Sequence, residues 1–233
     1  MARLPRLIVP HQPHHIVQQG IDRQPIFREP EDYGRFLGWL RESAREYKVA
    51  IHAYALMPSQ LQLLATPIDE DGLAQTMQRV GRYYVPWYNA KYARTGSLFQ
   101  GRFKTSVIDA AAYLLQCSLY IELGPVRAGL AGEALAYPWS SHAHHAGVNP
   151  DAVITDHALY WALGNTPFQR EAHYKQLAER SLTSAQLEAI DKAVLKGWPL
   201  GSDAFKASLE KKAQRQVLPA KRGRPFKAKP PAV

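Results

Sequence analysis

The sequence predicts an α+β fold, in which a ferredoxin-like antiparallel sheet carries helices on one face and is followed by a helical extension and a basic tail. Segments with strand-like and helix-like apolar spacing alternate over residues 14–123. Pro58 and Ser59 break one long apolar run, which indicates two antiparallel strands joined by a tight turn. Residues 217–233 contain four prolines and no apolar periodicity, which is typical of a disordered arm.

The elements of the first part are expected in the order strand, helix, strand, strand, helix, strand, helix. Their ranges are 14–19, 31–48, 49–57, 61–66, 71–92, 98–108 and 109–123. Pro86 lies inside the second helix and should kink or divide it, because proline lacks the backbone donor. Asp109 is the expected N-cap of the last helix, which Gly124 and Pro125 end.

The extension is expected to contain three helices after an irregular stretch over 137–165. Their ranges are 167–180, 184–195 and 203–215. Thr166 before Pro167 marks the start of the first, and Thr183 with Gln186 forms a capping box at the start of the second. We therefore divide the chain into a main domain over 1–148, a helical extension over 149–216 and a basic tail over 217–233.

Composition narrows the protein class. No apolar run of the 233 residues approaches the roughly 20 needed to span a bilayer, so no membrane partner is expected. A single Cys117 excludes an internal disulfide framework and any multi-cysteine zinc site, which together with the absence of a signal peptide favours a cytoplasmic protein.

Charge is concentrated at the C-terminal end. Of the net charge of +9, residues 206–233 carry nine Lys or Arg against the single acidic Glu210. A short basic arm on a near-neutral body is typical of polyanion binding, although such an arm can also serve solubility alone. Within it, Lys221-Arg222-Gly223-Arg224-Pro225 resembles an AT-hook core, in which Arg222 and Arg224 would enter the narrow minor groove of A·T-rich duplex.

A second basic segment, residues 72–108, contains no acidic residue. Its cations are Arg79, Arg82, Lys91, Arg94, Arg102 and Lys104. Tyrosine, tryptophan and phenylalanine are interleaved with them, and exposed rings stack on unpaired bases while cations neutralise phosphates. The segment therefore predicts binding of single-stranded or hairpin nucleic acid, with at least half of the rings expected in the core instead.

Several short segments carry a family resemblance. They are Met57-Pro58, Arg94-Thr95-Gly96, Gly101-Arg102-Phe103, residues 113–129 and Tyr137-Pro138-Trp139-Ser140-Ser141. In their order and spacing, over about residues 1–145, the chain resembles the REP-associated tyrosine transposases, within the HUH single-tyrosine class of insertion-sequence transposases. An HUH-transposase-like domain is therefore expected over 1–148, associated with DNA in the nucleoid.

The resemblance implies metal-dependent cleavage of a DNA strand. Two histidines that flank one apolar residue on a strand hold magnesium or manganese in this family, and a third ligand follows the nucleophile by four residues. The nucleophile is a tyrosine, which forms a 5′-phosphotyrosyl link. Tyr120 matches its position, so the resemblance implies that Tyr120 is the catalytic residue.

The chain departs from the family at every expected metal ligand. Gln60 and Gln62 stand where the family has histidines, and Gly124 stands where it usually has asparagine. Amide oxygens without an imidazole or carboxylate rarely hold a hard cation tightly, so no cofactor is expected. Magnesium or manganese would be expected only if the protein had residual activity.

Two functions from different classes follow from these departures. The first is a DNA-binding protein that recognises hairpin or single-stranded ends, as a monomer or homodimer, with cleavage lost or weakened. The alternative is an active transposase that nicks DNA through Tyr120. RNA binding is a third possibility, since unpaired RNA also suits stacking surfaces.

The remaining histidines are interpreted as structural or as surface groups. His142, His144 and His145 follow the Pro-Trp-Ser-Ser segment in an expected loop, where a surface cluster is favoured over a metal site. His15 matches a family position and is expected either to be structural or to contact DNA.

Overall fold

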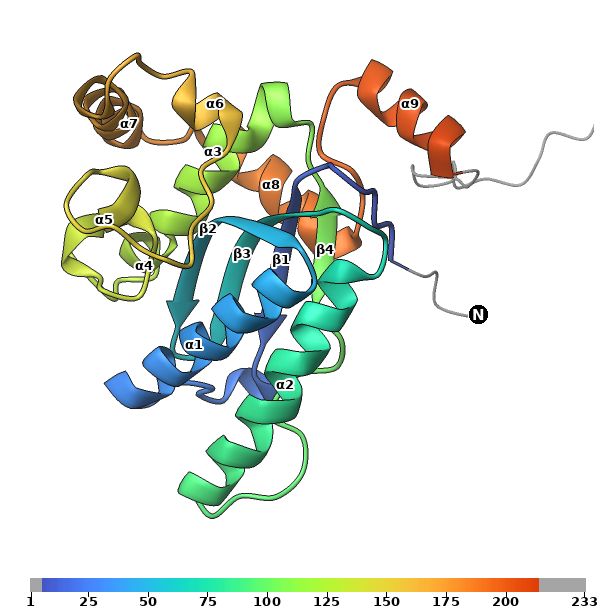
Figure 1. The fold of residues 1–233 in the computed structure, drawn as a ribbon, viewed down its shortest axis with the longest axis vertical. Helices are drawn as coiled ribbons and strands as arrows, with labels where there is room; N and C mark the ends of the chain where they lie inside the picture. Colours follow the sequence, from blue (N-terminus) through green and yellow to red (C-terminus); the bar gives the residue numbers. More distant parts are fainter. Residues whose placement is uncertain (1–5, 214–233) are drawn as a thin grey trace, which may run out of the picture.

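A computed structural model describes residues 6–213 of the chain. Its centre is a four-stranded antiparallel sheet with strand order β2-β3-β1-β4 (Figure 1). The strands are β1 (His14–Gln19), β2 (Val49–Met57), β3 (Gln60–Pro67) and β4 (Lys104–Val107). The predicted α+β class with an antiparallel sheet is confirmed. The last strand is shorter than predicted, because Phe99 forms only an isolated bridge to Gly20.

Two long helices cover one face of the sheet. They are α1 (Pro30–Glu46) and α2 (Gly72–Lys91), which lie side by side in front of the strands (Figure 1). A capping box of Glu29 and Asp32, with Pro30 in the first turn, starts α1. Pro86 does not divide α2, which runs as one helix through this exposed position.

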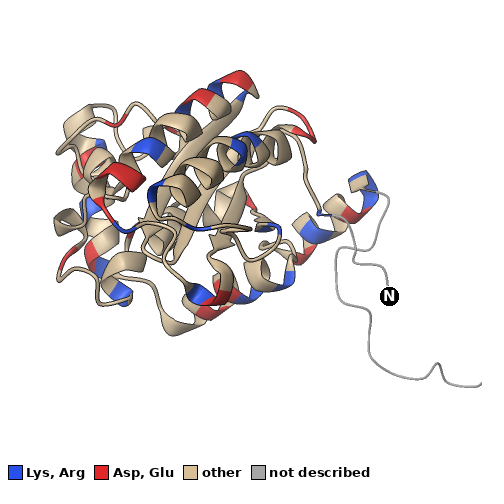
Figure 2. Ribbon diagram, turned by 90° about the horizontal axis from the view of Figure 1, so that it is seen from below, with Lys and Arg blue, Asp and Glu red and all other residues tan. Residues whose placement is uncertain are grey.

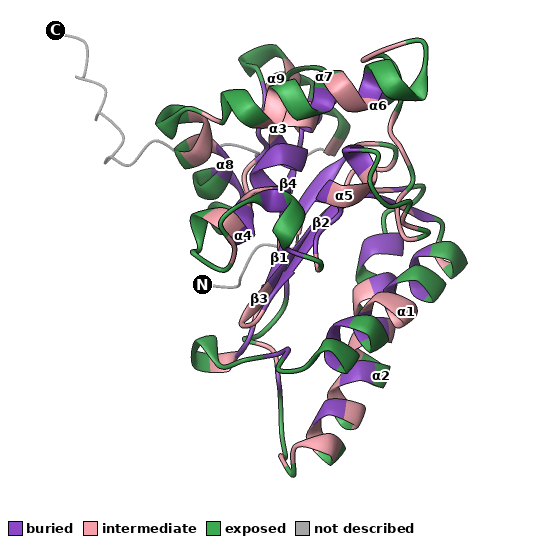
Figure 3. Cartoon of the chain, turned by 90° about the vertical axis from the view of Figure 1, so that its left-hand side faces the viewer, coloured by how far each residue is buried: buried purple, intermediate pink, exposed green. Residues whose placement is uncertain are grey.

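The opposite face is also covered, which corrects the expectation of helices on one face only. Helix α3 (Ala110–Glu122) and helix α8 (Ser184–Lys196) pack there, and Figure 3 shows the buried sheet between the two helical layers. The reason lies in β3, where Leu61 and Leu63 pack with α1 and α2 while Leu64 packs with α3. A strand buried on both sides loses the alternation of apolar and polar residues that marks a single covered face.

Shorter elements complete the described part. They are η1 (Ile21–Arg23), α4 (Gly124–Arg127), η2 (Ala134–Ala136), α5 (His142–His145), α6 (Ala158–Trp161), α7 (Pro167–Arg180) and α9 (Asp203–Ala213). The Thr166 cap of α7 and the Thr183–Gln186 capping box of α8 form as predicted. None of the helices within 6–213 is both long and apolar enough to cross a lipid bilayer.

The extension shares the core of the sheet. Ile190 and Ala193 of α8 are buried against Leu64 and Ile108, and α8 contacts β4 and α3. A division of the chain at residues 148 and 149 stays a prediction. The tail over 217–233, with Arg222 and Arg224, lies outside the described residues.

Candidate functional site

The predicted nucleophile and one predicted ligand position meet on the α3 face of the sheet. Nε2 of His15 on β1 donates to Oε1 of Gln62 on β3 over 3.0 Å. The ring of His15 meets the ring of Tyr120 edge-on, with 5.5 Å between the ring centroids. Gln60 lies two residues from Gln62 on the same strand, so both side chains project from the same face. Period-two alternation therefore places both glutamines where the resemblance implied the metal ligands.

The two amide oxygens already accept hydrogen bonds. Gln19 donates to Oε1 of Gln60 over 3.2 Å, and His15 donates to that of Gln62. Gly124 supplies no side chain, and a Cβ built there would touch Met57 and Arg127 at ordinary contact distance. These residues do not fit the hard divalent cation that the family uses, because two neutral amides and a glycine supply neither the carboxylate nor the imidazole ligands that hold such a cation tightly.

Tyr120 is held by charged partners from two other helices. Its hydroxyl donates to Asp191 of α8, and the guanidinium of Arg127 lies 4.4 Å above its ring. Only 6% of the residue is exposed. Burial and the Asp191 carboxylate raise the pKa of the Tyr120 phenol above its ordinary value. A phenol attacks phosphorus as its oxyanion, so this arrangement opposes the reaction that the resemblance implied.

His15 is a neutral, buried residue. Burial lowers its pKa to about 4, because desolvation outweighs the hydrogen bond with Gln62. Its Nδ1 is buried and has no hydrogen-bond partner within the described part of the chain. His15 therefore has a structural position inside the site and is not a surface contact for DNA.

Two cations of the basic aromatic segment, residues 72–108, already form ion pairs with carboxylates. Lys91 forms ion pairs of 3.0, 2.9 and 3.0 Å with Glu29, Glu31 and Asp32, and Arg79 pairs with Glu46. Since their charges are met by α1, these two cations are poor candidates for phosphate contacts. Figure 2 shows Lys and Arg mixed with Asp and Glu over the described ribbon.

The rings of this segment divide as expected between core and surface. Tyr84, Tyr88 and Phe103 are buried, whereas 46% of Tyr83 is exposed. Tyr83 stacks beside Trp39 with 6.2 Å between ring centroids, and Arg79 lies over its face. Arg94 lies over the ring of Tyr88, and Arg82 is exposed.

An open groove lies at the end of β1, beside the site. It has a volume of about 710 Å³ and is lined by Val17, Gln18, Gln19, Asp22, Arg23, Gln100, Gly101, Arg102 and Lys104. Three of these residues are cations, and Arg102 and Lys104 were predicted to bind DNA. Arg23 was not predicted, since it lies outside the acid-free segment. Gln19 connects the groove to the glutamine pair through its bond to Gln60.

The histidines after the Pro-Trp-Ser-Ser segment are not a surface loop, which corrects the interpretation from sequence. His142 and His145 lie on α5 and are buried, and both donate through Nδ1 to Glu122 over 3.2 and 2.6 Å. Glu122 lies two residues after Tyr120 and is completely buried. Its histidine partners hold the pKa of this carboxyl far below its usual value. The sequence signal was a single acidic residue in a helix that contains no other charged side chain.

Comparison with known proteins places the fold. No protein-family model matches the chain. No curated protein matches it either. Among solved structures, the chain is similar to a REP-associated tyrosine transposase bound to a REP hairpin, with a TM-score of 0.52 and 13% identity over 67% of this chain and 92% of the other. A Deinococcus radiodurans protein assigned as a transposase gives a TM-score of 0.36 and 17% identity over 49% of this chain and 93% of the other.

Over about two thirds of its length, the chain therefore has the fold of a REP-associated tyrosine transposase. At 13% identity the likeness concerns the fold. What the site does chemically rests on its own residues.

Proposed function

We propose that this protein binds single-stranded or hairpin DNA without cleaving it by the metal-dependent route of the tyrosine transposases. One observation carries the proposal: Gln60 and Gln62 stand at the expected ligand positions with their amide oxygens already bonded, beside a Tyr120 hydroxyl that donates to Asp191. A transposase fold supports DNA as the partner, because the similar solved structure holds a REP hairpin.

The groove at the end of β1 supplies the contacts that the proposal needs. Three cations line it: Arg23, Arg102 and Lys104. Within residues 6–213 none of them forms an ion pair with a carboxylate, and Arg102 is exposed. Unpaired cations of this kind neutralise phosphates. Gln100, which is exposed and lines the same groove, offers an amide group to base edges. The partner is therefore a strand of DNA whose bases are accessible, such as the foot of a hairpin.

Binding is tested with fluorescent hairpin DNA by anisotropy at fixed salt. The paired substitutions Arg102→Gln and Lys104→Gln should weaken binding at least tenfold and lower the salt dependence. Lys175→Gln, which removes an exposed cation from α7 away from the groove, is the matched control and should leave the affinity unchanged. Equal loss in all variants, or none, would refute the groove as the DNA site.

Cleavage is tested separately with 3′-labelled hairpin DNA and either magnesium or manganese, because a 5′-phosphotyrosyl link joins the protein to the fragment that carries the 3′ end. The expected result is no covalent adduct on a denaturing gel. An adduct that disappears in Tyr120→Phe would establish the alternative, an active transposase that nicks through Tyr120. Restoring Gln60→His, Gln62→His and Gly124→Asn in one chain should recover some cleavage if the cleft is intact.

A further inference from the structure

A second site lies on the other side of Glu122, away from Tyr120. Glu122 accepts from Ser141 Oγ, His142 Nδ1, His145 Nδ1 and Tyr174 Oη at 2.5, 3.2, 2.6 and 2.8 Å. These four donors fix the carboxylate in a fully buried position. Because His145 uses Nδ1 for Glu122, its Nε2 points away from α3.

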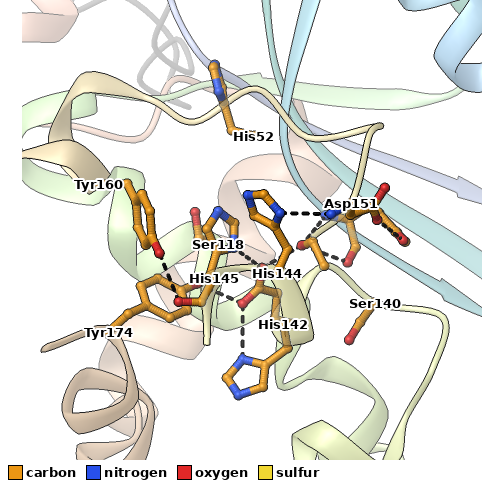
Figure 4. Close-up of polar contacts among 12 residues, drawn as sticks. His52, Ser118, Ser140, His142, His144, His145, Asp151, Tyr160 and Tyr174 are labelled. Atoms are coloured by element: carbon orange, nitrogen blue, oxygen red, sulfur yellow. Dashed lines mark hydrogen bonds and ion pairs between the residues drawn. The ribbon is translucent and has the colours of Figure 1, made fainter. Parts of the chain in front are cut away.

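That nitrogen faces a second carboxylate. Nε2 of His145 lies 3.8 Å from Oδ1 of Asp156, and Nε2 of His144 lies 3.2 Å from the same oxygen. The three ligand atoms all lie within 4.8 Å of one another. Figure 4 shows His144 and His145 close together beside Asp151, with His142 on the far side of the cluster. No similar group of three forms elsewhere in residues 6–213.

We propose that His144, His145 and Asp156 bind one divalent cation of the zinc class. Two imidazole nitrogens and one carboxylate oxygen are a ligand set that zinc accepts, with water in the fourth position. A cavity of about 230 Å³, lined in part by His144, Asp156 and Glu171, opens beside the ligands and gives that water a place. The site is distinct from the glutamine pair that the transposase resemblance pointed to.

Glu122 supports this assignment because it accepts a hydrogen bond from the ring nitrogen of His145 that does not face the metal. A ligating histidine usually donates its other ring N–H to a carboxylate, which fixes the tautomer and the ring orientation. The bond from His145 Nδ1 to Glu122 is that arrangement, and it directs Nε2 at Asp156. In the metal-free site Asp156 pairs with protons on the histidine nitrogens, and the proposed metal takes the place of those protons.

Metal binding would change the tautomer of His144 and its hydrogen bond with the Asp151 amide. Its Nδ1 accepts from the backbone N–H of Asp151 over 3.0 Å, so in the metal-free ring the proton lies on Nε2 and points to Asp156. Ligation through Nε2 displaces this proton and puts one on Nδ1, which ends the bond from Asp151. The Asp151 amide therefore reports on the metal, although it is not a ligand.

The experiment uses the untagged full chain, stripped with a chelator and titrated with Zn²⁺ by calorimetry. The expected result is binding of one equivalent, with a rise in the thermal midpoint and a shift of the Asp151 amide signal in ¹⁵N-resolved spectra. Co²⁺ should give visible absorption bands with the same stoichiometry. No binding, or several weak equivalents, would overturn the proposal and leave a hydrogen-bonded histidine–carboxylate network.

Variants decide which residues hold the ion. His144→Gln and Asp156→Asn change side chains that are 19% exposed, so both chains should fold and both should lose at least tenfold in affinity. His11→Asn removes an exposed histidine far along the sequence and is the matched control. Gln60→Ala with Gln62→Ala should also leave Zn²⁺ affinity unchanged. A loss there would move the metal to the Tyr120 site and refute the assignment.

Discussion

Tyr120 joins two charged partners that belong to different parts of the chain. Asp191 reaches it from α8 in the extension, and Arg127 from α4, the short helix that follows α3. The phenol therefore acts as a connector between α3 and α8. A side chain in this position can contribute to stability through the Asp191 contact, and that contribution can be measured.

Tyr120→Phe and Asp191→Ala should be coupled. Either substitution removes the hydrogen bond from the phenol to a charged acceptor, and we expect a coupling of about 1 kcal/mol because Asp191 is exposed. Urea unfolding of the two single variants and the double variant measures it. Strictly additive losses would mean that the contact between Tyr120 and Asp191 contributes nothing to stability.

Acid should destabilise the protein between pH 6.5 and about pH 4. His15 has a folded pKa of about 4 against 6.5 in the unfolded chain, so the unfolded state binds more protons in this window and stability falls as pH falls. Between pH 7 and pH 5 this one residue should lower the free energy of unfolding by about 2 kcal/mol. His14 has the same lowered pKa and adds to the loss.

The measurement compares urea unfolding of wild type and His15→Gln at several pH values. The variant should lose about one proton's worth of pH dependence in that window, whatever its stability at pH 7. His11→Asn, at an exposed position, should keep the full wild-type slope. A parallel pH profile for His15→Gln would show that His15 is not held neutral in the fold.

At the scale of residues, the sequence predicted which side chains share a face but not which hydrogen-bond and ion-pair partners they have. Alternation along β3 and the spacing to Tyr120 predicted which side chains share a face, because strand and helix periods fix directions. It did not predict that Asp191, 71 residues away, would take the hydroxyl. Nor did it show that Lys91 is surrounded by three carboxylates from around the start of α1. Such partners come from tertiary packing and leave no local pattern.

At the scale of elements, the seven-element order was predictable because caps and breaks mark it. The placement of α3 was not, since a helix with apolar residues all round gives no sign of which face of a sheet it covers. Helix α8, which belongs to the predicted extension, lies on the α3 face of the sheet. This has a testable consequence.

Ile190→Ala should weaken the whole fold. Ile190 is completely buried between α8 and the sheet, and removing its methyl groups should cost about 2–4 kcal/mol. Leu195→Ala changes a residue of the same helix that is 53% exposed, and should cost under about 0.5 kcal/mol. Calorimetry measures both. If Ile190→Ala split one transition into two, with the sheet melting unchanged, the extension would be an independent domain.

At the scale of the molecule, charge is distributed between a mixed surface, three cations at the β1 groove and a basic C-terminal sequence. In the basic aromatic segment, Arg79 and Lys91 lie against α1 and form ion pairs with carboxylates. Within the described residues, the three cations of the groove at β1 form no such pair. The second basic region is the C-terminal tail, where residues 217–233 hold five Lys or Arg and no acidic residue. Binding through both regions would join an open strand and a flanking duplex on one chain, with an affinity beyond that of either region.

Deletion of residues 217–233 should weaken binding to a hairpin with an A·T-rich stem more than to single-stranded DNA alone. Each lost phosphate contact lowers the slope of log affinity against log salt by about 0.9 on duplex, so the five tail cations can lower it by up to about 4.5. Arg222→Lys with Arg224→Lys keeps the charge but loses the flat guanidinium groups that suit a narrow minor groove. That variant should retain the salt slope and lose the preference for A·T. An unchanged affinity and slope after deletion would assign all DNA contacts to the groove, because the tail would then make no phosphate contact at all.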